Sequence, residues 1–120
     1  MKIHEISRLL DAKICCCEEK ADSEVSSACG SDMMSDVLAF VKDQAVLLTG
    51  LVNSQVIRTA EMMDMRCIVF VRNKQPTEEM LAIARDSGIV VLTTPMRMYE
   101  ACGVLYSSGL NSLKVAARHE

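Results

Sequence analysis

The sequence predicts an α/β fold, a mostly parallel sheet with helices on both faces. Three apolar runs, QAVLLTG, RCIVFVRN and GIVVLTTP, are each followed by polar or turn residues. Leu48, Phe70 and Leu92 hold equivalent places in them, since 70 − 48 = 22 and 92 − 70 = 22. Segments with helical spacing separate the runs. Apolar strands that alternate with helices are typical of parallel βαβ units, so we expect a βαβαβα core over residues 44–108.

The segments before this core are expected to add a helix and two strands. Apolar residues at helical spacing predict a short amphipathic helix over residues 3–11. The apolar run AKICCC at 12–17 predicts a buried strand, and VSSAC at 25–29 predicts a second extended piece. The charged segment 18–24 between them is typical of a loop.

The stretch ACGSDMMSDVLAF at 28–40 fits two interpretations. Its apolar spacing predicts a helix from Ser31 to about Lys42. Ser31 would then cap the helix and Asp32 would complement its dipole. The alternative is an active-site loop with a thiol and a carboxylate at a helix start. We interpret the stretch as a packing or interface feature.

Three further helices are predicted, one after each apolar run of the core. The residues that mark them are Val56, Ile57, Ala60 and Met63, then Met80, Leu81, Ile83 and Ala84, then Met98, Ala101, Val104 and Leu105. Thr77 is expected to cap the second of these helices, and Gly88 suits the position just after its end. Thr94 and Pro95 are expected to start the third. Residues 111–120 are expected to form a frayed tail or a surface helix.

Length and composition narrow the class of protein. A chain of 120 residues is expected to form a single domain, over residues 1–120. A net charge of −3 with mixed signs, and only four aromatic residues, argue against nucleic acid or an anionic membrane surface as a partner. The sequence contains neither a run of about 20 apolar residues nor a signal-peptide core. We therefore expect a cytoplasmic protein, with its six cysteines as free thiols.

The loops after the three core strands form the candidate ligand site. The carboxyl ends of parallel strands meet at one edge, where ligands bind in α/β sheets. The residues expected to line the site are Thr49, Gly50, Asn53, Arg72, Lys74, Thr93 and Thr94. Hydroxyls, an amide, two cations and the N–H groups of helix N-termini suit an anion or a nucleotide. The alternative is that these loops are only well-formed turns.

The cysteines suggest a second hypothesis, a thiol-based redox or metal sensor. Cys29 precedes a predicted helix N-terminus, which lowers a thiol pKa, so it is the candidate reactive cysteine. Cys15–Cys17 are consecutive, and neighbouring side chains of a strand point to opposite faces, so they lack the geometry of a CxxC metal pair. Buried structural thiols are the alternative reading, and no metal site is predicted.

No catalytic residue and no cofactor are predicted. The sequence contains no GxxxxGK[ST], GxSxG or HExxH motif. His4 and His119 lie near opposite termini, and each is expected at the surface. We therefore expect that the protein is not an enzyme.

Three stretches together resemble the DRTGG domain family: ACGSDMMSDVLAF, the run from Leu47 to Pro95, and MYEACGVLYSSGL. The resemblance extends from about Ile3 to Leu110. It implies an α/β regulatory domain of the kind found between the CBS domains of pyrophosphatases and upstream of the catalytic part of some phosphotransacetylases. A similar fold forms the N-terminal domain of HPr kinase, but without a P-loop this chain is not expected to be a kinase.

The resemblance is to short standalone members found in anaerobic bacteria. It implies a homodimer, with a protein partner in a hydrogenase or histidine-kinase signalling system. The five residues that name the family are missing, and the corresponding loop, Thr49–Asn53, keeps Gly50 but lacks the Asp-Arg pair. The leading hypothesis is a non-catalytic regulatory and dimerisation module that binds a small ligand such as a nucleotide.

Overall fold

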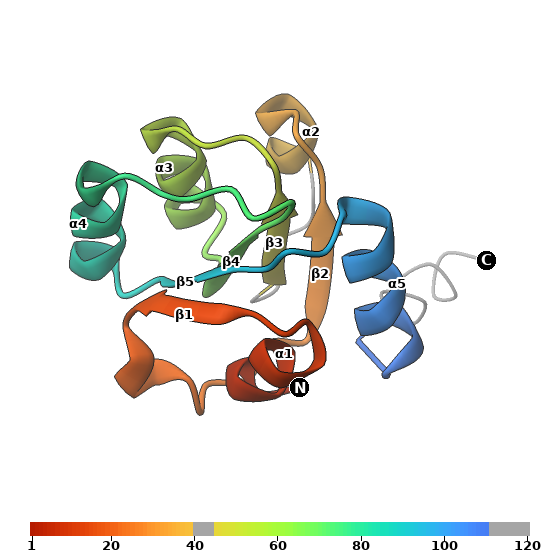
Figure 1. Cartoon of the computed structure of the whole chain (residues 1–120). Helices are drawn as coiled ribbons and strands as arrows, with labels where there is room; N and C mark the ends of the chain where they lie inside the picture. Colours follow the sequence, from red (N-terminus) through yellow and green to blue (C-terminus); the bar gives the residue numbers. More distant parts are fainter. Residues whose placement is uncertain (40–44, 111–120) are drawn as a thin grey trace.

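The computed structural model of the chain describes residues 1–39 and 45–110, and Figure 1 shows their arrangement. The strands are β1 (Lys13–Cys16), β2 (Ser27–Gly30), β3 (Ala45–Thr49), β4 (Cys67–Phe70) and β5 (Val90–Thr93). The helices are α1 (Ile3–Leu9), α2 (Met34–Leu38), α3 (Ser54–Met62), α4 (Glu78–Ser87) and α5 (Met98–Ser107), with a 3-10 turn η1 (Glu18–Lys20).

The five strands form one sheet in the order β1-β5-β4-β3-β2. Strands β2 to β5 are parallel, and β1 pairs antiparallel with β5 at the edge. This confirms the predicted α/β fold with a mostly parallel sheet. The predicted loop at 18–24 contains the short turn η1.

The strand order explains why helices lie on both faces. Strands β2, β3, β4 and β5 follow one another both in the chain and in the sheet. Because βαβ crossovers are right-handed, the connecting helices α2, α3 and α4 all lie on one face. The other face is left to the helices outside these crossovers, α1 and α5, which contact each other (Figure 1).

The core lies between the sheet and these two helical layers. Every residue of β3, β4 and β5 is buried, as expected for strands covered on both sides. Phe70 at the end of β4 is fully buried, and aliphatic side chains fill the space around it. Ile3 and Ile6 of α1 are buried on one face of the sheet, and Val56 and Ile57 of α3 are buried on the other.

Two predicted helix starts are wrong. Met33, and not Ser31, is the N-cap residue of α2, since Ser31 Oγ accepts the Met33 N–H at 3.0 Å in a tight turn before the helix. The predicted end of this helix near Lys42 lies outside the described residues. Thr94 and Pro95 do not start α5, whose N-cap residue is Arg97.

The residues predicted to begin and end α4 are confirmed. Thr77 Oγ1 accepts the Met80 N–H at 3.2 Å, as an N-cap residue does. Gly88 ends the helix in the left-handed conformation, with φ of 71°. The tail expected at 111–120 lies outside the described residues. None of the described helices is long and apolar enough to span a membrane.

Candidate functional site at the carboxyl edge of the sheet

Backbone hydrogen bonds join the loops at the carboxyl ends of the parallel strands. The Ser31 N–H donates to the Leu48 carbonyl at 3.0 Å. The N–H groups of Arg72 and Asn73 donate to the carbonyls of Met96 and Thr94, at 2.7 and 2.8 Å. These bonds cross between loops far apart in sequence, so they hold the edge as one surface.

Asp32 connects the first two loops of this edge. Its Oδ1 accepts the Gly50 N–H at 2.6 Å and the Thr49 hydroxyl at 3.1 Å. The same Thr49 oxygen accepts the Leu51 N–H at 3.1 Å. The prediction that Asp32 serves the dipole of its own helix is therefore wrong. This carboxylate fixes the loop after β3, and sequence reasoning did not place it in the candidate site.

Arg72 lies across the same loop. A Cβ atom at Gly50 would clash with the Arg72 guanidinium, so the glycine makes room for that side chain. Arg72 and Asn73 both have left-handed backbones, with φ of 57° and 58°, which turns the chain sharply after β4. In the part of the chain that the structure describes, neither Arg72 nor Lys74 forms an ion pair. Both side chains are exposed.

The other predicted site residues make contacts within the fold. Asn53 Oδ1 accepts the Val56 N–H at 3.1 Å and so caps α3. The buried Thr94 hydroxyl donates to the Leu10 carbonyl at 2.6 Å and accepts the Met96 N–H at 3.2 Å. Thr93 is also buried. The structure brings Gly50 and Arg72 together and holds Thr49, Thr93 and Thr94 below the surface.

The N-terminus of α3 differs from those of the other described helices. Its first turn carries no acidic residue, whereas Glu5, Asp36, Glu78 with Glu79, and Glu100 lie in the first turns of the others. Within residues 1–39 and 45–110, no hydrogen bond engages the N–H groups of Ser54 and Gln55. The first turn of this helix therefore places no acidic side chain against its positive partial charge.

The surroundings of Cys29 raise the pKa of its thiol. A Cβ atom at the next residue, Gly30, would point at α5, 2.7 Å from Cys102 Sγ. Because strand side chains alternate between faces, Cys29 points toward the opposite layer. Burial raises the pKa of its thiol, and the neighbouring Cys102 thiol and Asp36 carboxylate add to the rise. This direction is opposite to the lowering expected beside a helix N-terminus.

Cys16 and Cys17 of the Cys15–Cys17 cluster are buried, as is Cys67 in the core. Cys16 Sγ donates to the Ile89 carbonyl at 3.5 Å, and Cys17 Sγ donates to the Ala84 carbonyl at 3.9 Å. Burial raises the pKa of Cys16 to about 11 and also raises that of the fully buried Cys67. Within the described residues, no group of three His, Cys, Asp or Glu side chains is placed to hold a metal ion.

These raised pKa values lead to an expected loss of stability at alkaline pH. Between the ordinary thiol value of 9.0 and the Cys16 pKa of about 11, the unfolded chain releases protons that the native state keeps. The free energy of unfolding should therefore fall as pH rises through this range. Urea unfolding at about pH 8 and about pH 10 measures the fall. In the Cys16→Ala variant, the free energy of unfolding should fall less over this pH range. A fall equal to that of the wild type would mean that groups other than Cys16 cause it.

Comparisons with known proteins agree with this fold. The family model of the DRTGG domain matches residues 5–108. A solved structure of the CBS and DRTGG domains of the regulatory region of a Clostridium perfringens pyrophosphatase, complexed with the activator diadenosine tetraphosphate, is similar with a TM-score of 0.69. At 16% identity, the match covers 87% of this chain and 45% of that one, so this chain spans less than half of it. A comparison with curated proteins finds no match.

Proposed function

Since the chain belongs to the DRTGG domain family, we propose that it is a non-catalytic regulatory module that binds a nucleotide and forms a homodimer. The observation that carries the ligand proposal is the N-terminus of α3, which has no acidic residue in its first turn and lies beside the loop that Arg72 crosses. The homodimer, the cytoplasmic location and a partner in a hydrogenase or histidine-kinase system stay predictions from the sequence.

A phosphate group suits this position on chemical grounds. The N–H groups of Ser54 and Gln55 supply donors at the positive end of a helix dipole. The guanidinium of Arg72, which forms no ion pair with any described residue, supplies charge and a forked set of donors. Lys74 adds a second cation. Asn53 remains the cap of α3 and holds the helix start in place.

Asp32 acts in this proposal as a positioning residue. Its Oδ1 already accepts two donors from the loop after β3. A carboxylate repels phosphate, so we place the ligand on the Asn53 side of the loop, away from Asp32. Thr49 and Gly50 then define the shape of the loop through Asp32, and Thr93 and Thr94 support it from below.

The ligand proposal predicts that Arg72→Ala with Lys74→Ala weakens nucleotide binding by about tenfold or more, because a charged hydrogen bond contributes about 1.5–3 kcal/mol. Isothermal titration calorimetry with diadenosine tetraphosphate and with ATP measures the affinity. The matched control is Arg58→Ala with Arg66→Ala, which removes the same charge from exposed positions outside these loops. Equal weakening by both pairs would indicate a general charge effect, and no weakening by the first pair would contradict the placement.

The thiol-sensor hypothesis finds no support in the structure, because the shifted thiol pKa values are all raised. The non-catalytic part of the proposal agrees with the family, since the pyrophosphatase match lies in a regulatory region. His4 faces Asp22 at 3.3 Å, and both side chains are exposed.

A further inference from the structure

Two residues that meet at the carboxyl edge of the sheet, Gly50 and Arg72, each differ from what their backbone conformation favours. We propose that Gly50 is a positioning residue: its missing side chain leaves a place for the Arg72 guanidinium, which is held there to bind a phosphate group of the ligand. This inference rests on the proposed nucleotide site and names the residue that arranges its cation. Gly50 itself does not contact the ligand.

The guanidinium of Arg72 occupies the space in which a side chain at position 50 would begin. The three heavy atoms nearest to a Cβ atom built on Gly50 all belong to Arg72. They are Nη2, Cζ and Nε, of which Cζ would lie at 3.2 Å and Nε at 3.3 Å. These separations are shorter than the optimum of about 3.5–4.0 Å between non-bonded carbon atoms. Any side chain at position 50 would therefore displace the guanidinium.

The backbone of Gly50 gives no other reason for a glycine. Among the described residues, the glycines with positive φ are Gly88 and Gly109, so the φ of Gly50 is one that other residues also adopt. The Gly50 N–H donates to Asp32 Oδ1 at 2.6 Å, a bond that any residue except proline is able to form. The close approach of Arg72 is therefore what requires the glycine.

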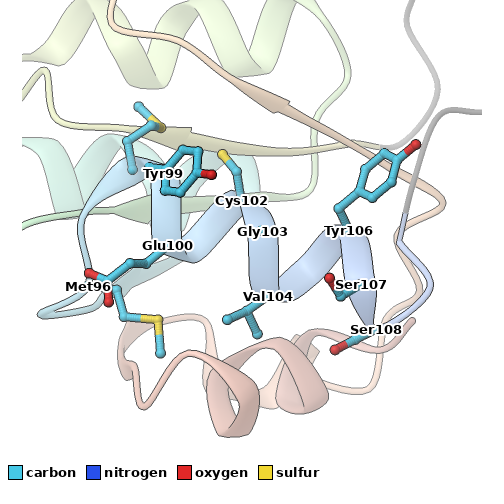
Figure 2. A pocket seen from close by; sticks show the side chains of 10 residues that line it. Met96, Tyr99, Glu100, Cys102, Gly103, Val104, Tyr106, Ser107 and Ser108 are labelled. Carbon is cyan, nitrogen blue, oxygen red and sulfur yellow. The ribbon is translucent and has the colours of Figure 1, made fainter.

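Arg72 shows the opposite mismatch. Its φ of 57° lies in the left-handed region, which glycine adopts without the strain that a side chain causes. Its N–H donates to the Met96 carbonyl at 2.7 Å, which fixes this residue to the segment that leads into α5. Met96 also lines the pocket along α5 that Figure 2 shows. An arginine at a position that favours glycine points to a role for its guanidinium.

The contact with Gly50 prepares this guanidinium for an anion. Arg72 is exposed and forms no ion pair in the part of the chain that the structure describes, so its charge is available. Its planar fork matches the oxygens of a phosphate group. A side chain that is already in place loses less conformational freedom when it binds, and this saving raises affinity.

Isothermal titration calorimetry of the full chain with ATP tests the inference. We expect Gly50→Ala to weaken ATP binding by about fivefold or more, because the added methyl group moves a guanidinium that forms charged hydrogen bonds with phosphate. The guanidinium ends a flexible side chain, so moving it should leave the melting temperature nearly unchanged. Gly103→Ala is the matched control, since a Cβ atom there would meet nothing within 4 Å, and it should leave the affinity unchanged.

A double-mutant cycle shows whether the effect passes through Arg72. In the Arg72→Ala background, Gly50→Ala should have no further effect on ATP affinity, because no guanidinium is left to displace. Further weakening there would mean that Gly50 acts through another contact, and would overturn the inference. If the wild type and Gly50→Ala bind ATP equally well, the inference is wrong while the nucleotide site stands. A wild type that binds neither ATP nor diadenosine tetraphosphate would overturn the proposed function itself.

Two further measurements do not depend on how well Gly50→Ala folds. Arg72→Gly and Arg72→Ala should weaken ATP binding equally, but Arg72→Gly should melt a few degrees higher, because glycine relieves the left-handed backbone. Equal melting temperatures would contradict the strain at position 72. In NMR relaxation of the unliganded wild type, the Nε–H group of Arg72 should be more ordered than those of the exposed Arg58 and Arg66. An Arg72 side chain as mobile as these two would overturn the inference.

Discussion

Replacing Asp32 with alanine should lower the free energy of unfolding by about 3 kcal/mol, because it removes two hydrogen bonds to a charged acceptor. One comes from the Gly50 N–H at 2.6 Å, and the other comes from the hydroxyl of Thr49, which is buried. After the substitution, the Thr49 hydroxyl loses its acceptor inside the protein. Urea unfolding of wild type and variant measures the loss.

Two companion variants separate the charge from the geometry. Asp32→Asn keeps an acceptor oxygen but not the charge, so we expect it to cost about half as much as the alanine. Asp36→Ala removes the same charge from the first turn of α2, where the carboxylate forms no hydrogen bond or ion pair with any described residue, and should cost about 0.5 kcal/mol or less. Equal losses for Asp32→Ala and Asp36→Ala would show that the contacts with Thr49 and Gly50 contribute nothing.

The same loop should also affect ligand binding. Because Asp32 fixes the loop that precedes α3, its loss should weaken nucleotide binding even though we place no ligand contact on it. The pattern would differ from that of Arg72→Ala with Lys74→Ala, which should change affinity with little change in stability. Measuring both quantities for both variants distinguishes a positioning residue from a binding residue.

The sheet was predictable because its signal is local and strong. Three strands buried on both faces must be continuous apolar runs, and the helices between them must show apolar spacing. The cap at Thr77 and the glycine at 88 follow equally local rules, and the structure confirms both. The start of α2 was not predictable in this way. Ser31 has the chemistry of a helix cap, but its hydroxyl accepts the Met33 N–H in a turn before the helix.

The candidate site was predictable only as a set of loops. Strand order places the loops that hold Thr49, Arg72 and Thr94 at one edge, but it does not say which side chains reach the surface. Thr94 was expected to be available, and it donates instead to the carbonyl of Leu10, 84 positions earlier in the chain. Asp32 was assigned to its own helix, and its partners lie 17 and 18 positions away. Contacts over such separations depend on tertiary packing, which leaves no pattern in one sequence.

Gly30 answers the question raised by the stretch ACGSD, and the second large effect is expected there. A Cβ atom at this position would lie 2.7 Å from Cys102 Sγ and 3.3 Å from Met98 Sδ. The glycine therefore lets α5 pack closely on the end of β2. Gly30→Ala should cost about 2 kcal/mol, since overpacking displaces a well-packed neighbour. Gly30 is therefore a packing residue, one of the two roles, packing or interface, expected for this stretch.

A double-mutant cycle tests whether Cys102 is the obstacle. Cys102→Ala removes the nearer sulfur, so in that background Gly30→Ala should cost about 1 kcal/mol less than in the wild type. The destabilisation that remains in the Cys102→Ala background comes from the contact with Met98. The flexible side chain of Met98 adjusts more easily than a short thiol on the same helix. Gly103→Ala is the matched control, since nothing lies within 4 Å of its added methyl group and helix propensity favours alanine. The glycine-to-alanine substitution should therefore destabilise the folded chain at position 30 and stabilise it at position 103. If the two single costs simply add in the Gly30→Ala, Cys102→Ala double variant, the close approach of α5 to β2 is not what requires the glycine.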